Sequence, residues 1–231
     1  MTMTVAHSTL LPRLHVDGAE DVQLRRIFCV GRNYEAHARE MGKDPTRDPP
    51  FFFTKWAETA VLGGGLISYP PATEDYHYEV ELVALLGADA FRVSAEQALD
   101  HVSAYAVGLD MTRRDLQLKA RAEGRPWDTG KNFAQSAPLG TFHPVSQVGH
   151  LQAGAIRLAV NGDIKQEADL SDLIWSVADI IAFLSELYPL HPGDIVMTGT
   201  PAGVGPVRPG DRLLATIEGL SPLNVTIGDP L

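Results

Sequence analysis

The stretch from Tyr76 to Leu86 limits the possible folds more than any other part of the chain. It is rich in aromatic and β-branched residues and ends at Gly87, which predicts a β-strand. Successive side chains of a strand point to opposite faces, so Glu79 and Glu81 share one face while apolar side chains occupy the other. The fold must therefore accommodate two neighbouring carboxylates on a mostly apolar strand.

The carboxylates of Glu79 and Glu81 allow two interpretations. Like charges one pleat apart repel each other and are costly to bury, so a buried strand needs a compensating group. A hard divalent cation bound through oxygen atoms would supply it. Alternatively, the strand lies at a sheet edge and water solvates its acidic face. The stretch alone does not decide between a metal site and an acidic edge.

Asp110 is a third carboxylate with two possible roles. It stands between a predicted strand, Ser103 to Leu109, and a predicted helix, Met111 to Ala120. Aspartate is a favoured N-cap residue, so helix capping accounts for Asp110 without any ligand. A role as metal ligand needs further support.

The remaining pattern predicts one α+β domain, mostly β with a few helices. Short buried strands are predicted at Ile27 to Val30 and at Phe51 to Phe53, and Asn161-Gly162 predicts a hairpin turn. The segment from Leu173 to Leu187 has apolar residues at the spacing of a core-packed helix. No repeat or linker interrupts the chain, and residues 1–26 are predicted to be a leader of short strands and turns.

A possible acid–base pair lies on a predicted short helix, Glu35 to Met41. His37 and Glu40 are three residues apart on it and therefore share one face. The polar, proline-rich segment from Gly42 to Pro50 follows, with the composition of a mobile loop or lid. The alternative is an ordinary solvent-exposed pair of side chains.

The charge balance excludes some classes of partner. The chain has 29 acidic residues against 19 lysines and arginines, a formal net charge of -10, which argues against general binding of nucleic acid or anionic membranes. The single cysteine, Cys29, lies in an apolar run and is predicted to be a buried thiol. No signal peptide or membrane-spanning run is apparent, so we expect a cytoplasmic protein.

Several separated motifs together resemble those of the fumarylacetoacetate hydrolase family. They occur in the family's order from about Ile27 to the C-terminus, and their combination is highly specific. The motifs are Val30-Gly31-Arg32-Asn33-Tyr34 with His37 and Glu40, Tyr78-Glu79-Val80-Glu81-Leu82, Leu109-Asp110-Met111-Thr112 with Arg114 and Gln117, Pro126-Trp127 before Lys131, Val160-Asn161-Gly162, and Thr198-Gly199-Thr200-Pro201 with Gly203-Val204-Gly205.

The resemblance implies a fold, a cofactor and an assembly. The fold would be a mixed β-roll in a single catalytic domain, residues 27–231, with a lid around residues 33–50. Mg²⁺ or Mn²⁺ would be bound by Glu79, Glu81 and Asp110, in agreement with the preference of these ions for oxygen ligands. The usual assembly in the family is a homodimer.

The resemblance also implies a reaction. The chain is most similar to the acylpyruvate hydrolase branch, in particular to bacterial enzymes that split fumarylpyruvate into fumarate and pyruvate during gentisate-type aromatic degradation. His37 would act as general base for the attacking water, with Glu40 orienting it, while the cation stabilises the departing pyruvate enolate. Lys131 would stabilise negative charge during catalysis. Substrate contacts are predicted for Gln117, Thr200, Arg32 and Arg114.

Each of these roles has an alternative. Without the resemblance, Gln117 would be interpreted as a surface residue of a helix and Lys131 as a solvated loop residue. Arg32 and Arg114 could instead stabilise loops through salt bridges. Relatives with the same metal core decarboxylate oxaloacetate or isomerise oxo acids, which is the alternative activity. A metal-stabilised protein without catalysis is the third possibility. The chain also has Lys55-Trp56 where the family commonly has Lys-Pro, so Trp56 is expected to reshape the pocket.

Overall fold

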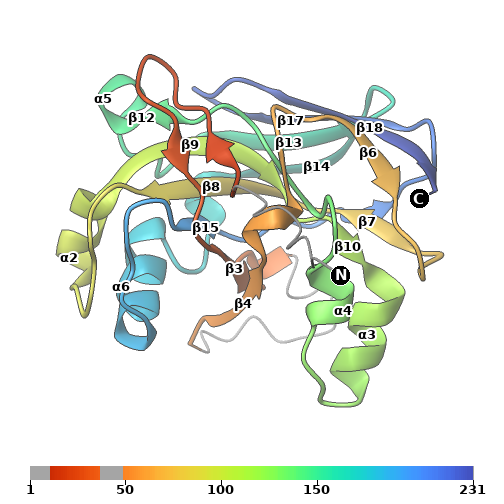
Figure 1. Cartoon of the computed structure of the whole chain (residues 1–231), viewed down its shortest axis with the longest axis horizontal. Coiled ribbons are helices and arrows are strands. Elements are labelled where there is room, and N and C mark those ends of the chain that lie inside the picture. The colour runs from red at the N-terminus through yellow and green to blue at the C-terminus, as the bar shows by residue number, and fades with distance from the viewer. Residues whose placement is uncertain (1–10, 37–48, 231) are drawn as a thin grey trace, which may run out of the picture.

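The computed structural model describes residues 11–36 and 49–230. Strands dominate, and they curl into a mixed sheet with helices at its sides (Figure 1), as predicted for an α+β β-roll. Thus the fold class is confirmed. Among the described residues, no helix is long and apolar enough to cross a membrane.

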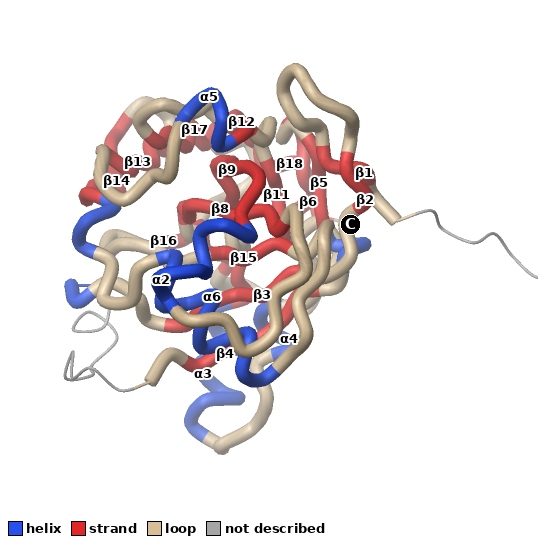
Figure 2. Tube along the Cα trace, turned by 90° about the vertical axis from the view of Figure 1, so that its left-hand side faces the viewer, coloured by secondary structure: helices blue, strands red, loops and turns tan. Residues whose placement is uncertain are grey.

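The largest sheet has eight strands and carries the buried centre of the molecule. Figure 2 shows β9, β8, β15, β3 and β4 following one another through it. Its path is β4 (Phe51–Lys55), β3 (Ile27–Gly31), β15 (Ile195–Met197), β8 (Val80–Leu86), β9 (Val102–Leu109), β11 (Ala137–Leu139) and β5 (Ala60–Leu62), with β12 (His143–Pro144) beside β9. Pairing is parallel between β3 and β15 and between β11 and β5, and antiparallel elsewhere.

Strand β8 is buried along its whole length because both its faces are covered. Leu82 and its alternate neighbours pack into one apolar cluster, whereas Val83 and Leu85 pack into another on the opposite face. A strand between two hydrophobic layers needs apolar residues on both faces. Glu81 is the exception in this strand, which makes it a candidate functional residue.

A five-stranded sheet covers one side of this core. Its order is β14 (Asp163–Asp169), β13 (Ala155–Val160), β17 (Arg212–Ile217), β18 (Leu223–Pro230) and β6 (Gly65–Tyr69). The predicted hairpin is confirmed, because Val160 pairs with Asp163 across the turn formed by Asn161 and Gly162, both at positive φ. Burial alternates along β17, so one face of this sheet lies on the core and the other is accessible.

The predicted continuous strand from Tyr76 to Leu86 is wrong in one respect. It is two strands in different sheets, interrupted at Glu79. The first, β7 (Tyr76–Tyr78), lies between β10 (Thr112–Arg113) and β16 (Gly205–Pro206), and the second is β8. At the break, the Val80 N–H donates a hydrogen bond at 3.0 Å to the side chain of Gln166, a residue of β14.

Two short strands and the helices complete the described chain. The strands β1 (Arg13–Leu14) and β2 (Val22–Gln23) form a small ribbon. The helices are α2 (Ala95–Ala98), α3 (Arg114–Ala122), α4 (Asp128–Lys131), α5 (Val145–Val148) and α6 (Val177–Leu187), with the 3₁₀ turns η1 (Ala57–Thr59), η2 (Leu99–His101) and η3 (Leu170–Asp172). Helices α2 and α6 lie together at one side of the sheet, and α3 and α4 at the other (Figure 1).

The helix predicted within the segment from Leu173 to Leu187 is confirmed, because α6 begins after Ser176, which forms a reciprocal capping box with Asp179, and ends at Leu187. The helix predicted from Met111 begins later than expected. Helix α3 begins at Arg114, with Arg113 as its N-cap, so Asp110 does not cap it. That correction removes the structural explanation for Asp110.

The N-terminal segment contributes side chains to the core. Leu14, Val16 and Leu24 are buried in the cluster that also contains Cys29. Burial raises the pKa of the Cys29 thiol well above its ordinary value, and Asp110 adds to the effect. The prediction of a buried thiol is therefore confirmed.

Candidate metal centre and active site

Three carboxylates meet where β7, β8 and β9 end or begin. Glu79 lies between β7 and β8, Glu81 is the second residue of β8, and Asp110 directly follows β9. The Asp110 N–H donates to the carbonyl oxygen of Glu79 at 2.9 Å, which holds the two backbones together. Glu79, Glu81 and Asp110 are 4%, 1% and 0% exposed, and each places a carboxylate oxygen within 4.8 Å of the others. The acidic-edge interpretation is therefore wrong.

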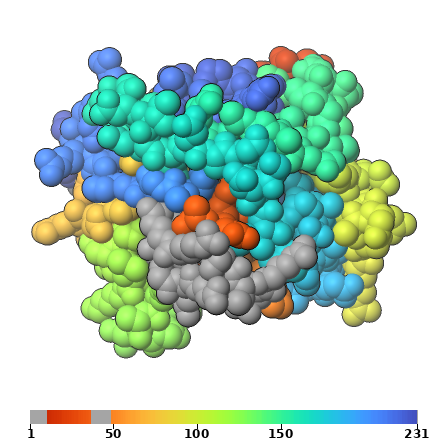
Figure 3. Space-filling model, turned by 180° about the vertical axis from the view of Figure 1, so that it is seen from behind, coloured from red at the N-terminus to blue at the C-terminus, as the bar shows by residue number. Residues whose placement is uncertain are grey.

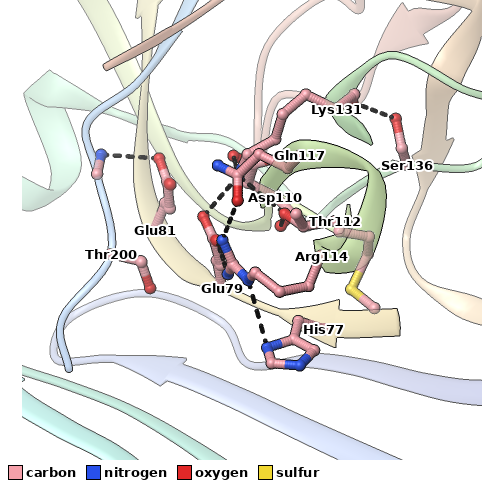
Figure 4. Close-up of polar contacts among 12 residues, drawn as sticks. His77, Glu79, Glu81, Asp110, Thr112, Arg114, Gln117, Lys131, Ser136 and Thr200 are labelled. Carbon is pink, nitrogen blue, oxygen red and sulfur yellow. Dashed lines mark hydrogen bonds and ion pairs between the residues drawn. The ribbon is translucent and has the colours of Figure 1, made fainter. Parts of the chain in front are cut away.

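Lys131 and Arg114 neutralise part of this negative charge (Figure 4). The Lys131 ammonium lies 2.8 Å from Glu79 Oε2 and 2.6 Å from Asp110 Oδ2, and it is itself buried. Burial alone would lower the pKa of Lys131, but Asp110 and Glu79 outweigh it and raise the pKa. The Arg114 guanidinium pairs with Glu79 Oε1. Lys131 is thus a buried cation of the centre and not a solvated loop residue.

A second buried lysine, Lys55, was not predicted. Its ammonium lies 2.8 Å from Asp110 Oδ1 and donates to the carbonyl oxygens of Met111, at 3.1 Å, and of Lys131. Its side chain is fully buried, at the end of β4. A lysine two residues after the phenylalanines of a predicted buried strand is the signal that could have identified it.

In contrast to Glu79 and Asp110, Glu81 forms no ion pair with a lysine or arginine among the described residues. Its Oε2 accepts a hydrogen bond from the Gly199 N–H at 2.7 Å (Figure 4). Even so, burial together with the charges of Asp110 and Glu79 raises the pKa of Glu81 well above its ordinary value. A divalent cation among the three carboxylates would favour ionised Glu81. An all-carboxylate donor set suits Mg²⁺ or Mn²⁺, so these residues fit the ion predicted from the sequence.

The structure brings the predicted substrate-contacting residues to the same centre. Gln117 is buried on α3 and accepts a hydrogen bond from Arg114 at 2.5 Å. Thr200 is buried and its hydroxyl accepts from Gln166 at 2.7 Å. Gln166 was not predicted. Its side chain accepts a hydrogen bond from the Val80 N–H and donates one to the Thr200 hydroxyl, so it connects Thr200 to the strand break at Glu79.

Arg32 reaches the centre from the loop that follows β3. It has a positive φ of 59°, which is uncommon for a residue with a side chain. Its guanidinium lies 5.0 Å from the ring centre of Phe51 and 5.9 Å from that of Trp127. These rings fix the direction of the Arg32 side chain.

A small cavity unites these groups. Its volume is about 20 Å³, and its wall includes Glu79, Glu81, Lys131 and Thr200. That space suffices for an ion or one water molecule. Trp56, expected to reshape the pocket, is 65% exposed and is not among the described residues that line the cavity.

His37, Glu40 and the greater part of the predicted lid lie outside the described residues. Their roles stay predictions. The segment that leads to them, ending with Tyr34, Glu35 and Ala36, lines a surface hollow together with Pro201 and Ala202. Figure 3 shows this segment in orange-red, reaching the surface between blue C-terminal and turquoise segments.

The geometry defines a buried cluster of three carboxylates that could hold a divalent cation, the donor set of a metal-dependent enzyme that uses a Lewis acid. Residues 26–228 match the family described as fumarylacetoacetate (FAA) hydrolase C-terminal, and the chain belongs to this family. The family predicted from the sequence motifs is therefore confirmed.

Individual relatives agree with this assignment. A fumarylpyruvate hydrolase from Ralstonia sp is 48% identical over 185 residues, covering 80% of this chain and 96% of that protein. A mitochondrial oxaloacetate decarboxylase from Dictyostelium discoideum is 37% identical over 196 residues, covering 85% and 90%. The crystal structure of fumarylpyruvate hydrolase from Pseudomonas aeruginosa with Mn²⁺ and pyruvate has a TM-score of 0.94 at 48% identity, covering 97% of this chain and 99% of that chain.

Proposed function

We propose that this protein is a metal-dependent hydrolase that cleaves the C–C bond of an acylpyruvate, converting fumarylpyruvate into fumarate and pyruvate. The observation that carries the proposal is the buried centre of Glu79, Glu81 and Asp110 with Lys131 beside it. It occurs in a chain 48% identical to a structure holding Mn²⁺ and pyruvate. We place the enzyme in the cytoplasm, in aromatic degradation.

Glu79, Glu81 and Asp110 would hold Mg²⁺ or Mn²⁺. When bound, the cation supplies Lewis-acid stabilisation of the negative charge that develops on the departing pyruvate. Lys131 supports the same charge, because its buried ammonium has no competing bulk water around it. Gly199, whose N–H fixes the Glu81 carboxylate, keeps this ligand oriented.

His37 would remove the proton of the attacking water, with Glu40 orienting its imidazole. A general base of this kind contributes about 10²–10⁴-fold in rate. Its support is the position of the preceding segment: Tyr34 is buried, and Arg32 lines the metal cavity. The chain therefore enters the predicted lid next to the centre.

Four side chains would position the substrate. Gln117 and Arg114 form a hydrogen-bonded pair on one face of α3 and both line the cavity. Thr200 and Arg32 line its other walls. Arginine and lysine around a small cavity favour an acidic oxo compound over a neutral one.

The test is the release of pyruvate from fumarylpyruvate by the purified protein with Mn²⁺, followed by a coupled assay. We expect turnover that is lost with a chelator and restored by Mn²⁺. His37→Ala should lower kcat by about 10²-fold or more while Mn²⁺ binding, measured by calorimetry, stays unchanged. A protein that binds Mn²⁺ but releases no pyruvate contradicts the proposed function.

A second activity is favoured by the similarity to an oxaloacetate decarboxylase. Decarboxylation would also place negative charge on a pyruvate unit next to the cation. Oxaloacetate should therefore be included in the assay, with carbon dioxide as the measured product. Faster turnover of oxaloacetate than of fumarylpyruvate would make decarboxylation the main activity.

We also propose a homodimer, as expected for the family. The accessible face of the five-stranded sheet supports it, because a row of residues from neighbouring strands there includes Ile164, Ala159 and Leu214. Ile164 and Leu214 are 59% and 42% exposed, and Leu66 on the same sheet is 68% exposed. Covering these side chains would favour association of two copies. Light scattering of the purified protein measures the assembly directly.

A further inference from the structure

Gln166 is a fully buried residue in a strand whose other residues are exposed or half-buried. The pairing of β14 with β13 explains the difference. Leu158 pairs with Gln166, but the next residue of β13, Ala159, pairs with Ile164. Lys165 is therefore an extra residue in β14, a β-bulge that interrupts the alternation of side chains. The bulge directs the Gln166 side chain inward, away from the accessible face on which Ile164 lies.

The backbone fixes which way the Gln166 side-chain amide points. Its Oε1 accepts a hydrogen bond from the Val80 N–H at 3.0 Å, and its Nε2 donates to the Pro201 carbonyl oxygen at 2.8 Å. A backbone N–H can only donate and a carbonyl oxygen can only accept, so turning the amide over would break both hydrogen bonds. The amide nitrogen of Gln166 therefore faces Pro201 and its neighbour Thr200.

This orientation determines the direction of the Thr200 hydroxyl hydrogen. Nε2 of Gln166 lies 2.7 Å from the Thr200 hydroxyl oxygen, and an amide nitrogen can only donate. The hydroxyl oxygen must accept, which leaves its own hydrogen for a different partner. Within residues 11–36 and 49–230, the Thr200 hydroxyl forms no second hydrogen bond. Its hydrogen is therefore available to a ligand.

The segment that carries Thr200 is also held in place by its backbone. Gly203 has a φ of 95°, and a Cβ atom there would collide with the carbonyl oxygen of Lys165, so this segment packs directly on β14. The Gly199 N–H donates to the Glu81 carboxylate at 2.7 Å. Thr200 is thus fixed between β14 and a proposed metal ligand, and it lines the small cavity together with Glu81 (Figure 4).

We propose that Gln166 is a positioning residue that makes the Thr200 hydroxyl a hydrogen-bond donor to an oxygen atom of the substrate's pyruvate unit. This inference rests on the proposed function. A cation held by the carboxylates attracts an oxygen atom of an oxo acid towards the cavity that Thr200 lines. Such an oxygen is an acceptor, so a hydroxyl whose hydrogen already points away from Gln166 binds it without first having to reorient.

A purely structural role for Gln166 is the alternative. Its amide would then only connect Val80 to Pro201, and its removal would weaken the site whether or not Thr200 carries a hydroxyl. The two roles differ in one measurable respect. A positioning residue that acts through the Thr200 hydroxyl loses its effect when that hydroxyl is absent.

The test is a double-mutant cycle of Gln166→Met and Thr200→Val, which remove polar atoms and keep the side chains similar in size. We expect Thr200→Val to lower kcat/KM for fumarylpyruvate by about ten- to a hundred-fold, because a hydrogen bond to a charged substrate is lost. Gln166→Met alone should lower it by about ten-fold, since the hydroxyl is then free to rotate. Added to Thr200→Val, Gln166→Met should cost less than about two-fold.

Two further variants control the cycle. Thr200→Ser keeps the hydroxyl, so Gln166→Met should again cost about ten-fold when added to it. Thr141→Val is the matched control, because Thr141 lies between β11 and β12 and is not among the described residues that line the cavity. Added to it, Gln166→Met should cost the same ten-fold or so as in the unmodified protein. An equal cost with and without Thr200→Val overturns the inference and leaves the proposed function standing.

A binding measurement repeats the cycle without turnover. Calorimetry of the Mn²⁺-loaded protein gives the dissociation constant of pyruvate, the compound present in the related crystal structure. We expect each single variant to bind Mn²⁺ normally and pyruvate about ten-fold more weakly, and the double variant to bind pyruvate no more weakly than Thr200→Val.

The outcomes separate the two proposals. Unchanged pyruvate binding in Thr200→Val overturns the inference, and so does loss of Mn²⁺ binding in Gln166→Met, because Gln166 would then act through the strand break at Val80. An unmodified protein that binds pyruvate but releases none from fumarylpyruvate contradicts the proposed function, while the pyruvate affinities still decide the role of Gln166.

Discussion

Two lysine side chains from different parts of the chain form ion pairs with Asp110. Lys131 contacts one of its carboxylate oxygens at 2.6 Å, and Lys55 contacts the other at 2.8 Å. Because Lys55 is fully buried, its charge is stabilised by protein groups and not by water: this contact, two carbonyl oxygens and the ring of Phe133. Lys55 therefore acts as a positioning residue, holding a proposed metal ligand in one orientation.

Removing the Lys55 charge should destabilise the fold. We expect Lys55→Met to lower the free energy of unfolding by about 3–5 kcal/mol, because Asp110 then loses one buried partner. Urea unfolding of the metal-free protein measures the change. Lys165→Met is the matched control, since Lys165 forms an exposed pair with Asp163 at 3.5 Å and should cost under about 1 kcal/mol. Similar losses in both variants would rule out the role assigned to Lys55.

The proposed metal ligands and two of their cationic partners, Lys131 and Arg114, were predicted from the sequence, but Lys55 and Gln166 were not. Glu79 and Glu81 stand out because carboxylates interrupt a mostly apolar stretch, whereas the ligand role of Asp110 was predicted only through the family resemblance. Lys55 and Gln166 act through contacts with segments 55 and 86 residues away. Their importance arises only when the sheets bring these segments together.

At the scale of elements, the break between β7 and β8 determines the shape of the site. A continuous strand would have kept Glu79 in the plane of one sheet. Instead, β7 joins the three-stranded sheet while β8 stays in the large one, and Glu79 lies at the crossing. Alternation of apolar residues predicted the strands, but it contains no signal for a change of sheet, so the break was missed.

The start of α3 is fastened to the segment before β7 by Asp115. Its carboxylate accepts hydrogen bonds from the Thr73 hydroxyl at 2.6 Å and from the backbone N–H groups of Glu74, at 3.1 Å, and Leu116, at 2.8 Å. Burial alone would raise the pKa of Asp115, but these hydrogen bonds outweigh it and lower the pKa. The ionised carboxylate is therefore favoured by folding.

Asp115→Asn should reveal this linkage through its pH dependence. Because the folded pKa is below the unfolded value of about 3.8, the stabilisation is complete above that value and is lost as the pH falls through the folded pKa. We expect a loss of about 0.5–1 kcal/mol at pH 7, shrinking below pH 4, by urea unfolding. Asp163→Asn, at an exposed position, is the control. A loss that is constant down to pH 2 would contradict the linkage.

At the scale of the whole molecule, the metal centre joins the beginning of β8, the end of β9 and, through Gly199, the segment after β15. A cation binds there only to the folded chain, because in the unfolded chain the three carboxylates are not held together. It should therefore stabilise the entire domain by mass action. Stability and metal occupancy are coupled for this reason.

Mn²⁺ at about 100 times its dissociation constant should stabilise the fold by about 2.7 kcal/mol. For a chain of this size, that corresponds to a rise in Tm of about 5–10 °C. Scanning calorimetry with Mn²⁺ and with a chelator measures it, and Glu81→Gln should largely remove the rise. An unchanged Tm at saturating Mn²⁺ would argue against a cation among the three carboxylates.

The pairing of β3 with β15 has a consequence for how the chain is made. Residues 27–29 pair in parallel with residues 195–197, so one edge of β3 has no partner until most of the chain has been synthesised. During synthesis, the paired strands β3 and β4 therefore have an apolar edge with unpaired backbone groups. Strands of other chains can pair with such an edge. The same late strand leads directly to Thr198 and Gly199, so a nascent chain gains its complete cation site only when that edge closes.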